Sequence, residues 1–233
     1  MSDLFDNRDH RRAIIDRRDL AARLDAIGIE SSDSAARRRA MVALLKAALD
    51  DGRTEIERRL LERPSSGRVA ANATAFLIDQ IIRLSHDFTI GYLYPSANRS
   101  AGERITLIAV GGYGRGEMAP HSDIDIGFLT PFKQTSWTEQ VIEAQLYTLW
   151  DLGLKVGHSS RSLDEMIRAA KEDLTIRTAL LEGRFVWGDR DLYDEASARF
   201  DAEVVAGNAR AFVAEKLAER DERHKRMGDS RYV

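Results

Sequence analysis

The sequence contains no cysteine among its 233 residues and only four prolines. A chain without cysteine forms no disulfide and offers no thiolate to a metal, which is typical of proteins from a reducing compartment. No apolar run approaches the roughly 20 residues that cross a bilayer. The first residues, Met1 to Asp6, lack the charged and apolar regions of a signal peptide. We therefore expect a cytoplasmic protein of bacterial type with no membrane partner.

An excess of charge of one sign is also missing. Lys and Arg number 35 against 38 Asp and Glu, for a formal net charge of −3. Residues 1–63 are dense in arginine, but their thirteen arginines are matched by thirteen acidic residues, which indicates a solvated helical surface laced with ion pairs. Proteins that bind nucleic acid usually show a clear basic excess or patch. We predict no nucleic-acid partner.

The first hundred residues favour helices. Apolar residues recur at helical spacing over 11–27, and Gly28 is typical of a helix C-terminus. Asp33 is a good N-cap for a second helix. We expect that helix to bend near 51–52 and to end before the linker at 64–67.

A further amphipathic helix is predicted over 69–93. The sequence pattern changes from helical to strand-like at Arg104. Residues 105–110 are a short, β-branched, apolar run that predicts a buried strand. A glycine-rich loop follows it, and 124–129 predicts a second strand. Residues 154–158 predict a third short strand.

The remaining sequence returns to helical spacing. A helix is predicted over 138–152, and Ser162 and Asp173 are expected N-caps of later helices. The segment 183–188 interrupts the helical pattern between two glycines. One or two last helices then run to about His224.

Two aspartates provide the clearest chemical signal. Alternate residues of a strand point the same way, about 6.6 Å apart, so Asp123 and Asp125 share one face while Ile124 and Ile126 turn to the core. Two carboxylates so placed can converge on Mg²⁺, which prefers oxygen ligands shared with substrate phosphates. We predict that Asp123 and Asp125 are catalytic metal ligands.

The glycines that precede these aspartates suit phosphate binding. Gly111, Gly112 and Gly114 come directly off a buried strand, and their lack of a Cβ lets backbone N–H groups approach an anion closely. Arg115 adds a charge-assisted donor. A strand, a phosphate loop and a strand with two acids are together what metal-assisted attack on a nucleoside triphosphate requires.

Two other glycine-rich loops fit poorly. A dinucleotide-binding loop needs G-x-G-x-x-G leading into a helix, but Glu117 stands where the third glycine belongs and a strand follows soon after. A kinase loop needs a strand lysine close behind it, and the next lysine is Lys133, beyond the acids.

Several other residues have side chains that often act in catalysis or binding, but we predict structural roles for them. We interpret the His86–Asp87 pair as part of an amphipathic helix, and Tyr113 as either packing on a base or covering the loop. The others are interpreted as turn, strand, solvated or core residues: His121, His158, Arg161, Arg184, Trp137, Trp150 and Trp187.

Gly111-Gly112 with Ser122-Asp123-x-Asp125 resembles the signature of the DNA polymerase β-like nucleotidyltransferase superfamily. The longer string at 111–117 and the Ser-Asp-Ile-Asp-Ile that follows resemble one family within it, the bifunctional uridylyltransferase/uridylyl-removing enzymes of bacterial nitrogen control. The stretches 150–159 and 223–232 also agree, so the resemblance runs from about residue 104 to the C-terminus.

The resemblance implies an activity and a fold. Family members transfer UMP from UTP to a tyrosine of the PII signal protein, and separate domains remove it and sense glutamine. The family's glycine pair falls on Gly111 and Gly112, its metal-binding aspartates on Asp123 and Asp125, and we include Ser122 among the substrate-binding residues. The implied fold is an α/β palm of the polymerase β type, a small mixed sheet preceded and followed by helices.

We divide the chain into a helical region at 1–96, a nucleotidyltransferase domain at 97–190 and a C-terminal helical segment at 191–233. Full-length family members are several times longer, so we expect an N-terminal piece that holds only the transferase.

One departure from the superfamily concerns metal ligands. Many members supply a third carboxylate from a later strand, and 154–158 has none, which leaves His158, Asp164 and Glu182 as alternatives. Two other functions therefore stay open. One is a non-catalytic regulatory module that binds nucleotide, and the other is a nucleotidyltransferase that acts on a small-molecule acceptor.

Overall fold

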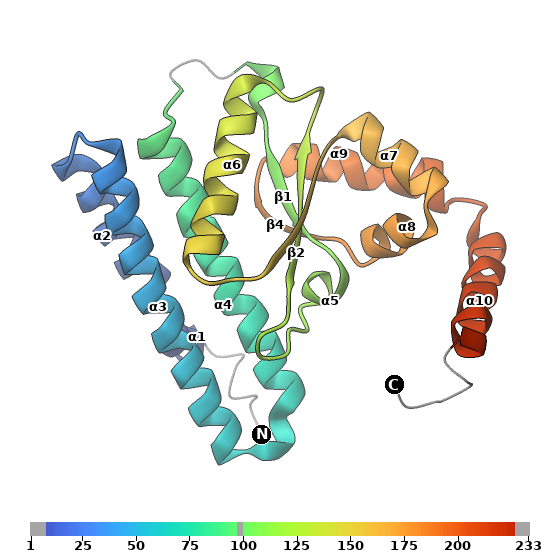
Figure 1. Cartoon of the computed structure of the whole chain (residues 1–233), viewed down its shortest axis with the longest axis horizontal. Helices are drawn as coiled ribbons and strands as arrows, with labels where there is room; N and C mark the ends of the chain where they lie inside the picture. The colour runs from blue at the N-terminus through green and yellow to red at the C-terminus, as the bar shows by residue number, and fades with distance from the viewer. Residues whose placement is uncertain (1–7, 97–99, 227–233) are drawn as a thin grey trace.

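The structure is a computed structural model that describes residues 8–96 and 100–226 (Figure 1). A four-stranded sheet in the order β3-β2-β1-β4 lies between helices on both of its faces. The predicted class, α/β with a small mixed sheet preceded and followed by helices, is confirmed. The closing similarity at 223–232 extends beyond the described residues, and Met1 to Asp6 lie outside them.

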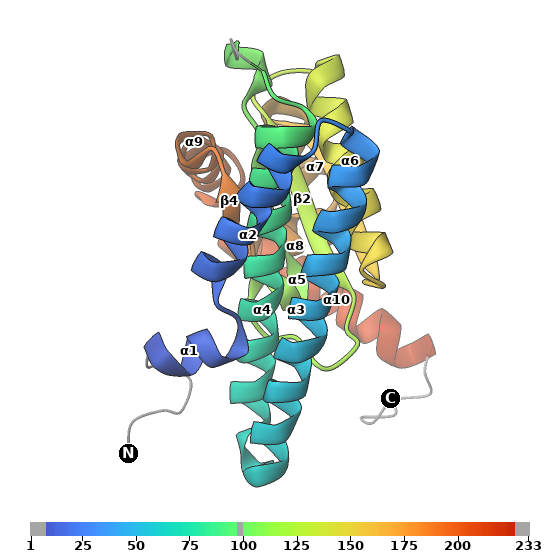
Figure 2. The same cartoon turned by 90° about the vertical axis from the view of Figure 1, so that its left-hand side faces the viewer.

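The N-terminal part is helical, as predicted. Its long helices α3 and α4 run side by side, joined by a short 3₁₀ turn at the predicted linker (Figure 2). Its elements are α1 (Arg8–Ile14), α2 (Arg17–Glu30), α3 (Ser34–Glu62), the 3₁₀ turn Pro64–Ser66, α4 (Gly67–Phe88), and the π-helical turn Thr89–Leu93 that continues α4.

The predicted helix over 11–27 is two helices instead of one. Asp16 accepts hydrogen bonds from the backbone N–H groups of Arg18 and Asp19, and this cap starts α2 after a break. The predicted stop at Gly28 is wrong, because α2 continues past it. A Cβ on Gly28 would lie 2.4 Å from the Tyr92 ring, so the missing side chain makes room for packing.

The predicted bend at 51–52 is also wrong, since α3 is continuous there. A Cβ on Gly52 would lie 2.7 Å from Leu77 of α4 and 2.9 Å from the carbonyl oxygen of Ile14. A glycine inside a helix suggests a break when the sequence is considered alone, whereas here it permits close helix packing. The predicted cap at Asp33 is confirmed.

The sheet is mixed. β1 pairs antiparallel with β2 and with β4, and β2 pairs parallel with β3. The third predicted strand begins two residues later than expected and extends to Ser162. The strands are β1 (Thr106–Ala109), β2 (Ile124–Thr130), β3 (Val156–Ser162) and β4 (Arg184–Gly188).

The predicted interruption of the helical pattern at 183–188 is confirmed, but the strand β4 that forms it was not predicted. Its glycine boundaries favour a loop, and its length of five residues gives little periodicity. Pairing with β1 satisfies its backbone groups and makes it a strand.

The later helices follow the prediction, and Ser162 and Asp173 cap α7 and α8 as expected. They are α6 (Ser136–Asp151), α7 (Leu163–Glu172), α8 (Leu174–Leu181), α9 (Arg190–Phe200) and α10 (Ala209–Arg226). The segment predicted as a glycine-rich loop contains a short helical turn, α5 (Gly111–Gly114). No helix within the described residues is long and apolar enough to cross a membrane.

Alternation along the strands divides the interior into two cores. Leu107, Ile126 and Val186 face the larger core, which contains α2, α3, α4 and α6. Ile108 and Leu129 face a smaller core under α7 and α9. Each fully buried aliphatic side chain contributes about 1.5–3 kcal/mol. The larger core therefore joins the N-terminal helices and the sheet into one folding unit.

A buried guanidinium fastens α1 to α3. The Arg59 side chain donates to the carbonyl oxygen of His10 at 3.0 Å and to Glu55 at 2.6 Å. Hydrogen bonds from Arg58, joined by those from Arg59, outweigh partial burial and lower the pKa of Glu55 from 4.5 to about 2. Glu55 is thus the charge that compensates a guanidinium only 7% exposed.

Glu55→Gln is expected to lower the free energy of unfolding at pH 7 by about 1–3 kcal/mol, the usual effect of losing a hydrogen bond to a charged group. Because folding lowers this pKa, the stabilisation is present above about pH 4.5 and is lost as the pH falls toward 2. Urea unfolding of both proteins across this range tests it, with the exposed Glu57→Gln as control. A difference that stays constant between pH 7 and pH 2 would contradict the assignment.

Candidate active site

Asp123 and Asp125 lie at the beginning of β2. Both are exposed, and they alternate with Ile124 and Ile126, each only 1% exposed. Since these isoleucines face the larger core, the two carboxylates share the opposite face of the sheet. The predicted alternation is confirmed.

The carboxylate of Asp125 lies between two glycines. A Cβ on Gly111 would lie 3.4 Å from Asp125 Oδ2, and a Cβ on Gly157 would lie 2.4 Å from Oδ1. Gly157 is the partner of Asp125 in the parallel ladder between β2 and β3. Any side chain at 157 would therefore displace this carboxylate. Gly157 was not among the predicted site residues, although a glycine inside a strand often marks a position that another group approaches closely.

The two acids form an uncompensated negative site. Burial raises the pKa of Asp125, the charge of Asp123 raises it further, and no cation contributes to this shift. Mg²⁺ is usually bound by one or two carboxylates together with substrate phosphates. The residues present therefore fit a hard divalent cation.

None of the alternatives for a third ligand joins the two acids. His158 packs edge-on against Trp150, with ring centroids 6.1 Å apart. Asp164 accepts a hydrogen bond from Arg199 at 2.7 Å, and Glu182 is ion-paired with Arg115. Among the residues that the structure describes, no three His, Asp or Glu side chains are grouped to hold a metal ion.

The glycine-rich loop forms a single helical turn, α5, directly after β1. Gly111 has φ +59°, a conformation that favours glycine, and Gly114 and Arg115 donate to the carbonyl oxygens of Val110 and Gly111. The first N–H groups of a helical turn have no partner within it. Those of Gly111, Gly112 and Tyr113 are therefore the donors that this turn offers to a phosphate.

Gly114 has a packing role. A Cβ there would lie 2.2 Å from the carbonyl oxygen of Glu182 and 3.0 Å from that of Ala109. The turn can sit against the segment before β4 only if this position is glycine.

Arg115 and Ser122 flank the turn and the acids. Arg115 is exposed and pairs with Glu182 at 2.7 Å and with Glu117 at 3.5 Å, so a phosphate would compete with two carboxylates for it. Ser122 is exposed next to Asp123. His121 has φ +65°, as expected of a turn residue.

Sequence reasoning also missed the part that α4 plays at this loop. Asn72 donates to the carbonyl oxygen of Gly116 at 2.6 Å, and Asp79 accepts from the hydroxyl of Tyr113 at 2.7 Å. Tyr113 is 1% exposed and turns toward α4, so it covers the inside of the loop and does not face a base. Asp79-Gln80, set within an otherwise apolar helical run, was the available signal.

The predicted structural roles of Arg184 and Trp150 are wrong. Arg184 is half-buried and bonded to Asp79 instead of being solvated, because β4 starts beside α4. Trp150 is not in the core: it is 44% exposed on the outer side of α6. The His86–Asp87 pair does lie within α4, where Asp87 accepts from Arg17 and from Trp187.

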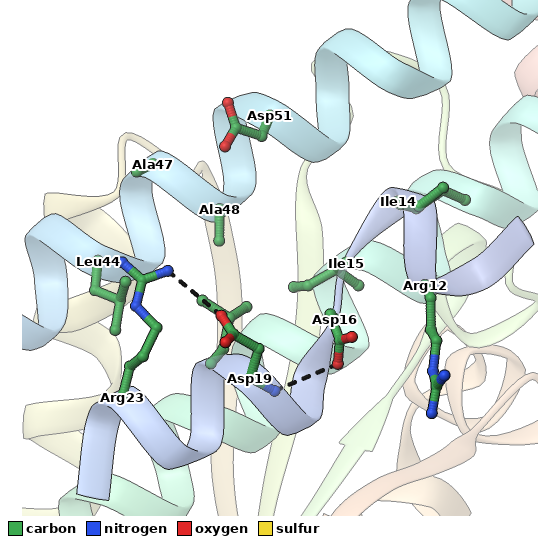
Figure 3. A pocket seen from close by; sticks show the side chains of 12 residues that line it. Arg12, Ile14, Ile15, Asp16, Asp19, Arg23, Leu44, Ala47, Ala48 and Asp51 are labelled. Atoms are coloured by element: carbon green, nitrogen blue, oxygen red, sulfur yellow. Dashed lines mark hydrogen bonds and ion pairs between the residues drawn. The ribbon is translucent and has the colours of Figure 1, made fainter. Parts of the chain in front are cut away.

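A cavity of about 310 Å³ lies apart from these residues, between α2 and α3 (Figure 3). Three of its charged groups serve the local structure: Arg23 pairs with Asp19 at 3.5 Å, and Asp16 caps α2. None of the predicted site residues lines it, so we place no chemistry there.

Comparison with known proteins gives a consistent result. Residues 96–186 match the nucleotidyltransferase domain family. Over 96% of its length the chain is 66% identical to a bifunctional uridylyltransferase/uridylyl-removing enzyme of Novosphingobium aromaticivorans. Proteins of the same description from Erythrobacter litoralis and Rhodospirillum rubrum are 60% and 55% identical over 95% of the chain.

The chain spans 24% of the length of each of these relatives. The comparisons nevertheless confirm the family resemblance inferred from the motifs. Residues 96–186 form a nucleotidyltransferase domain, in a chain similar over nearly its whole length to bifunctional uridylyltransferase/uridylyl-removing enzymes.

Proposed function

We propose that this chain transfers UMP from UTP to a tyrosine hydroxyl of the PII signal protein, in the cytoplasm, as part of bacterial nitrogen regulation. The tyrosine oxygen bonds to the α-phosphorus, pyrophosphate leaves with the electrons of the broken P–O bond, and the phenolic proton is released. The observation that carries the proposal is the uncompensated pair Asp123 and Asp125 beside the glycine turn. The descriptions of the relatives support uridylyl transfer.

Each site residue has a role in this reaction. Asp123 and Asp125 hold Mg²⁺, which when bound neutralises triphosphate charge and favours loss of the hydroxyl proton. The N–H groups of the turn at Gly111 and Gly112 bind phosphate oxygens, and Gly114 lets the turn take its place. Arg115 exchanges its carboxylate partners for a phosphate, and Ser122 donates beside the metal site.

One observation favours a second function, a nucleotide-binding regulatory module without turnover. The described residues hold no third acid beside Asp123 and Asp125. The two functions differ in one measurable respect, because only the enzyme releases pyrophosphate from UTP when PII is present.

Asp123→Ala and Asp125→Ala are each expected to lower UMP transfer by more than about 100-fold, since even residues that only support metal ligands are worth 10–100-fold. Transfer is measured as radiolabelled UMP on purified PII with Mg²⁺. The control is Asp50→Ala, an exposed aspartate of α3.

The outcomes separate the candidate functions. Label on PII that survives both substitutions would overturn the assignment of the acids. Mg·UTP binding without label in the wild type would favour the regulatory module. Label that appears on small hydroxylated acceptors but not on PII would indicate a small-molecule transferase.

Gly157→Ala is expected to lower kcat roughly 100-fold without unfolding the protein. Its Cβ would lie 2.4 Å from Asp125 Oδ1, so the carboxylate must move, and displacements near 1 Å can cost about that much. The matched control is Gly67→Ala, where a Cβ would have no neighbour within 4 Å. Steady-state transfer and thermal unfolding of both variants check this, and an unchanged kcat in Gly157→Ala would show that Asp125 does not need its present position.

A further inference from the structure

The glycine turn rests on three residues from different elements, Asp79, Tyr113 and Arg184, which we call the support cluster. Asp79 lies in α4, Tyr113 in α5, and Arg184 is the first residue of β4. Figure 1 shows α5 between the end of the sheet and α8, with α4 on the other side of the sheet. Asp79 is 7% exposed, so a helix of the N-terminal region places a buried carboxylate next to the turn.

Asp79 is the centre of the support cluster. Its Oδ1 accepts from the Tyr113 hydroxyl at 2.7 Å and from Arg184 Nη2 at 3.0 Å, and its Oδ2 accepts from Arg184 Nη1 at 2.7 Å. A bidentate guanidinium–carboxylate pair restricts both groups in distance and in angle. Arg83 adds a second cation 3.8 Å from Oδ2.

Arg184 also binds the backbone of the turn. Its Nη2 donates to the carbonyl oxygen of Tyr113 at 3.2 Å, and its Nε donates to that of Gly114 at 3.3 Å. These carbonyls are at the C-terminal end of the turn, where a cation is favourable. Because N–H and C=O groups of a helical turn point in opposite directions, holding its carbonyls also aims its free N–H groups.

The Tyr113 side chain also fixes the turn, through its own hydrogen bond to Asp79. Burial raises the pKa of its hydroxyl well above the ordinary value, and the nearby charge of Asp79 raises it further, so the hydroxyl remains a donor at neutral pH. Tyr113 is thus held by the Asp79 carboxylate directly, and Tyr113 and Gly114 are held by it through Arg184.

We propose that Asp79 is a positioning residue of the nucleotide site: through Tyr113 and Arg184 it sets the orientation in which the glycine turn binds the triphosphate. This role rests on the proposed function, because it needs a nucleotide at Gly111 and Gly112. It assigns the N-terminal helical region an indirect part in substrate binding, through Tyr113 and Arg184.

The test compares two aspartates of the same helix. Asp79 accepts from Arg184 and Tyr113, whereas Asp87 accepts from Arg17 and Trp187, which do not touch the turn. Asp79→Asn and Tyr113→Phe are compared with Asp87→Asn. Measurements are thermal unfolding, KM and kcat for UTP with PII, and the Kd of Mg·UTP by calorimetry.

We expect Asp79→Asn and Tyr113→Phe to raise KM and Kd for UTP roughly tenfold, as loss of a supporting partner commonly does. Asp87→Asn is expected to lower stability to a similar extent while KM, kcat and Kd stay within about twofold. Tyr113→Phe keeps the ring, so the test stands even if Asp79→Asn fails to fold.

The possible failures are distinguishable. If wild-type UTP binding is intact and Tyr113→Phe leaves KM and Kd unchanged, the positioning role is overturned and the proposed function stands. If Asp87→Asn weakens UTP binding as much as Tyr113→Phe does, the effect is general destabilisation and the positioning role is again overturned. If the wild type neither binds UTP nor labels PII, the proposed function is overturned and the positioning role with it.

Discussion

The burial of α4 is the constraint on which the rest of the structure depends. Its side chains contact α3 and α6 and cover one face of the sheet, and Leu77, Ile81 and Ile82 are fully buried. A helix in that position orders two regions that sequence patterns describe separately, the N-terminal helices and the strands. It also places Asp79 beside the glycine turn, so that hydrophobic burial gives this turn a rigid support.

Charge compensation distinguishes the structural carboxylates from the two aspartates of the candidate site. Asp79, Asp87 and Glu55 each have arginine partners, and a carboxylate so paired can be partly or wholly buried. Asp123 and Asp125 lie on the same face of the sheet, and burial together with the charge of Asp123 raises the pKa of Asp125. Placing like charges together costs stability, and a cation bound between them would offset that cost. Such an arrangement is expected where function, and not folding, has set the residues.

Much of the architecture follows from local signals because those signals are physical requirements of single elements. Asp33, Ser162 and Asp173 are N-caps because a helix start needs an acceptor. Asp123 and Asp125 share a face because strand side chains alternate. The wrong predictions at Gly28 and Gly52 have one cause. A glycine within a helical pattern predicts a break, whereas here a neighbouring helical segment requires its small size.

The sequence by itself determined the resemblance to nucleotidyltransferases, the shared face of Asp123 and Asp125, and the glycine-rich segment after β1, since these signals lie close together along the chain. Only the tertiary structure decided that β4 is a strand, that Gly157 makes room for Asp125, and that Asp79 and Arg184 hold the turn. These relations join residues 32 to 105 positions apart in the chain. Their physical basis is contact across the fold, which no periodicity or cap within one segment encodes.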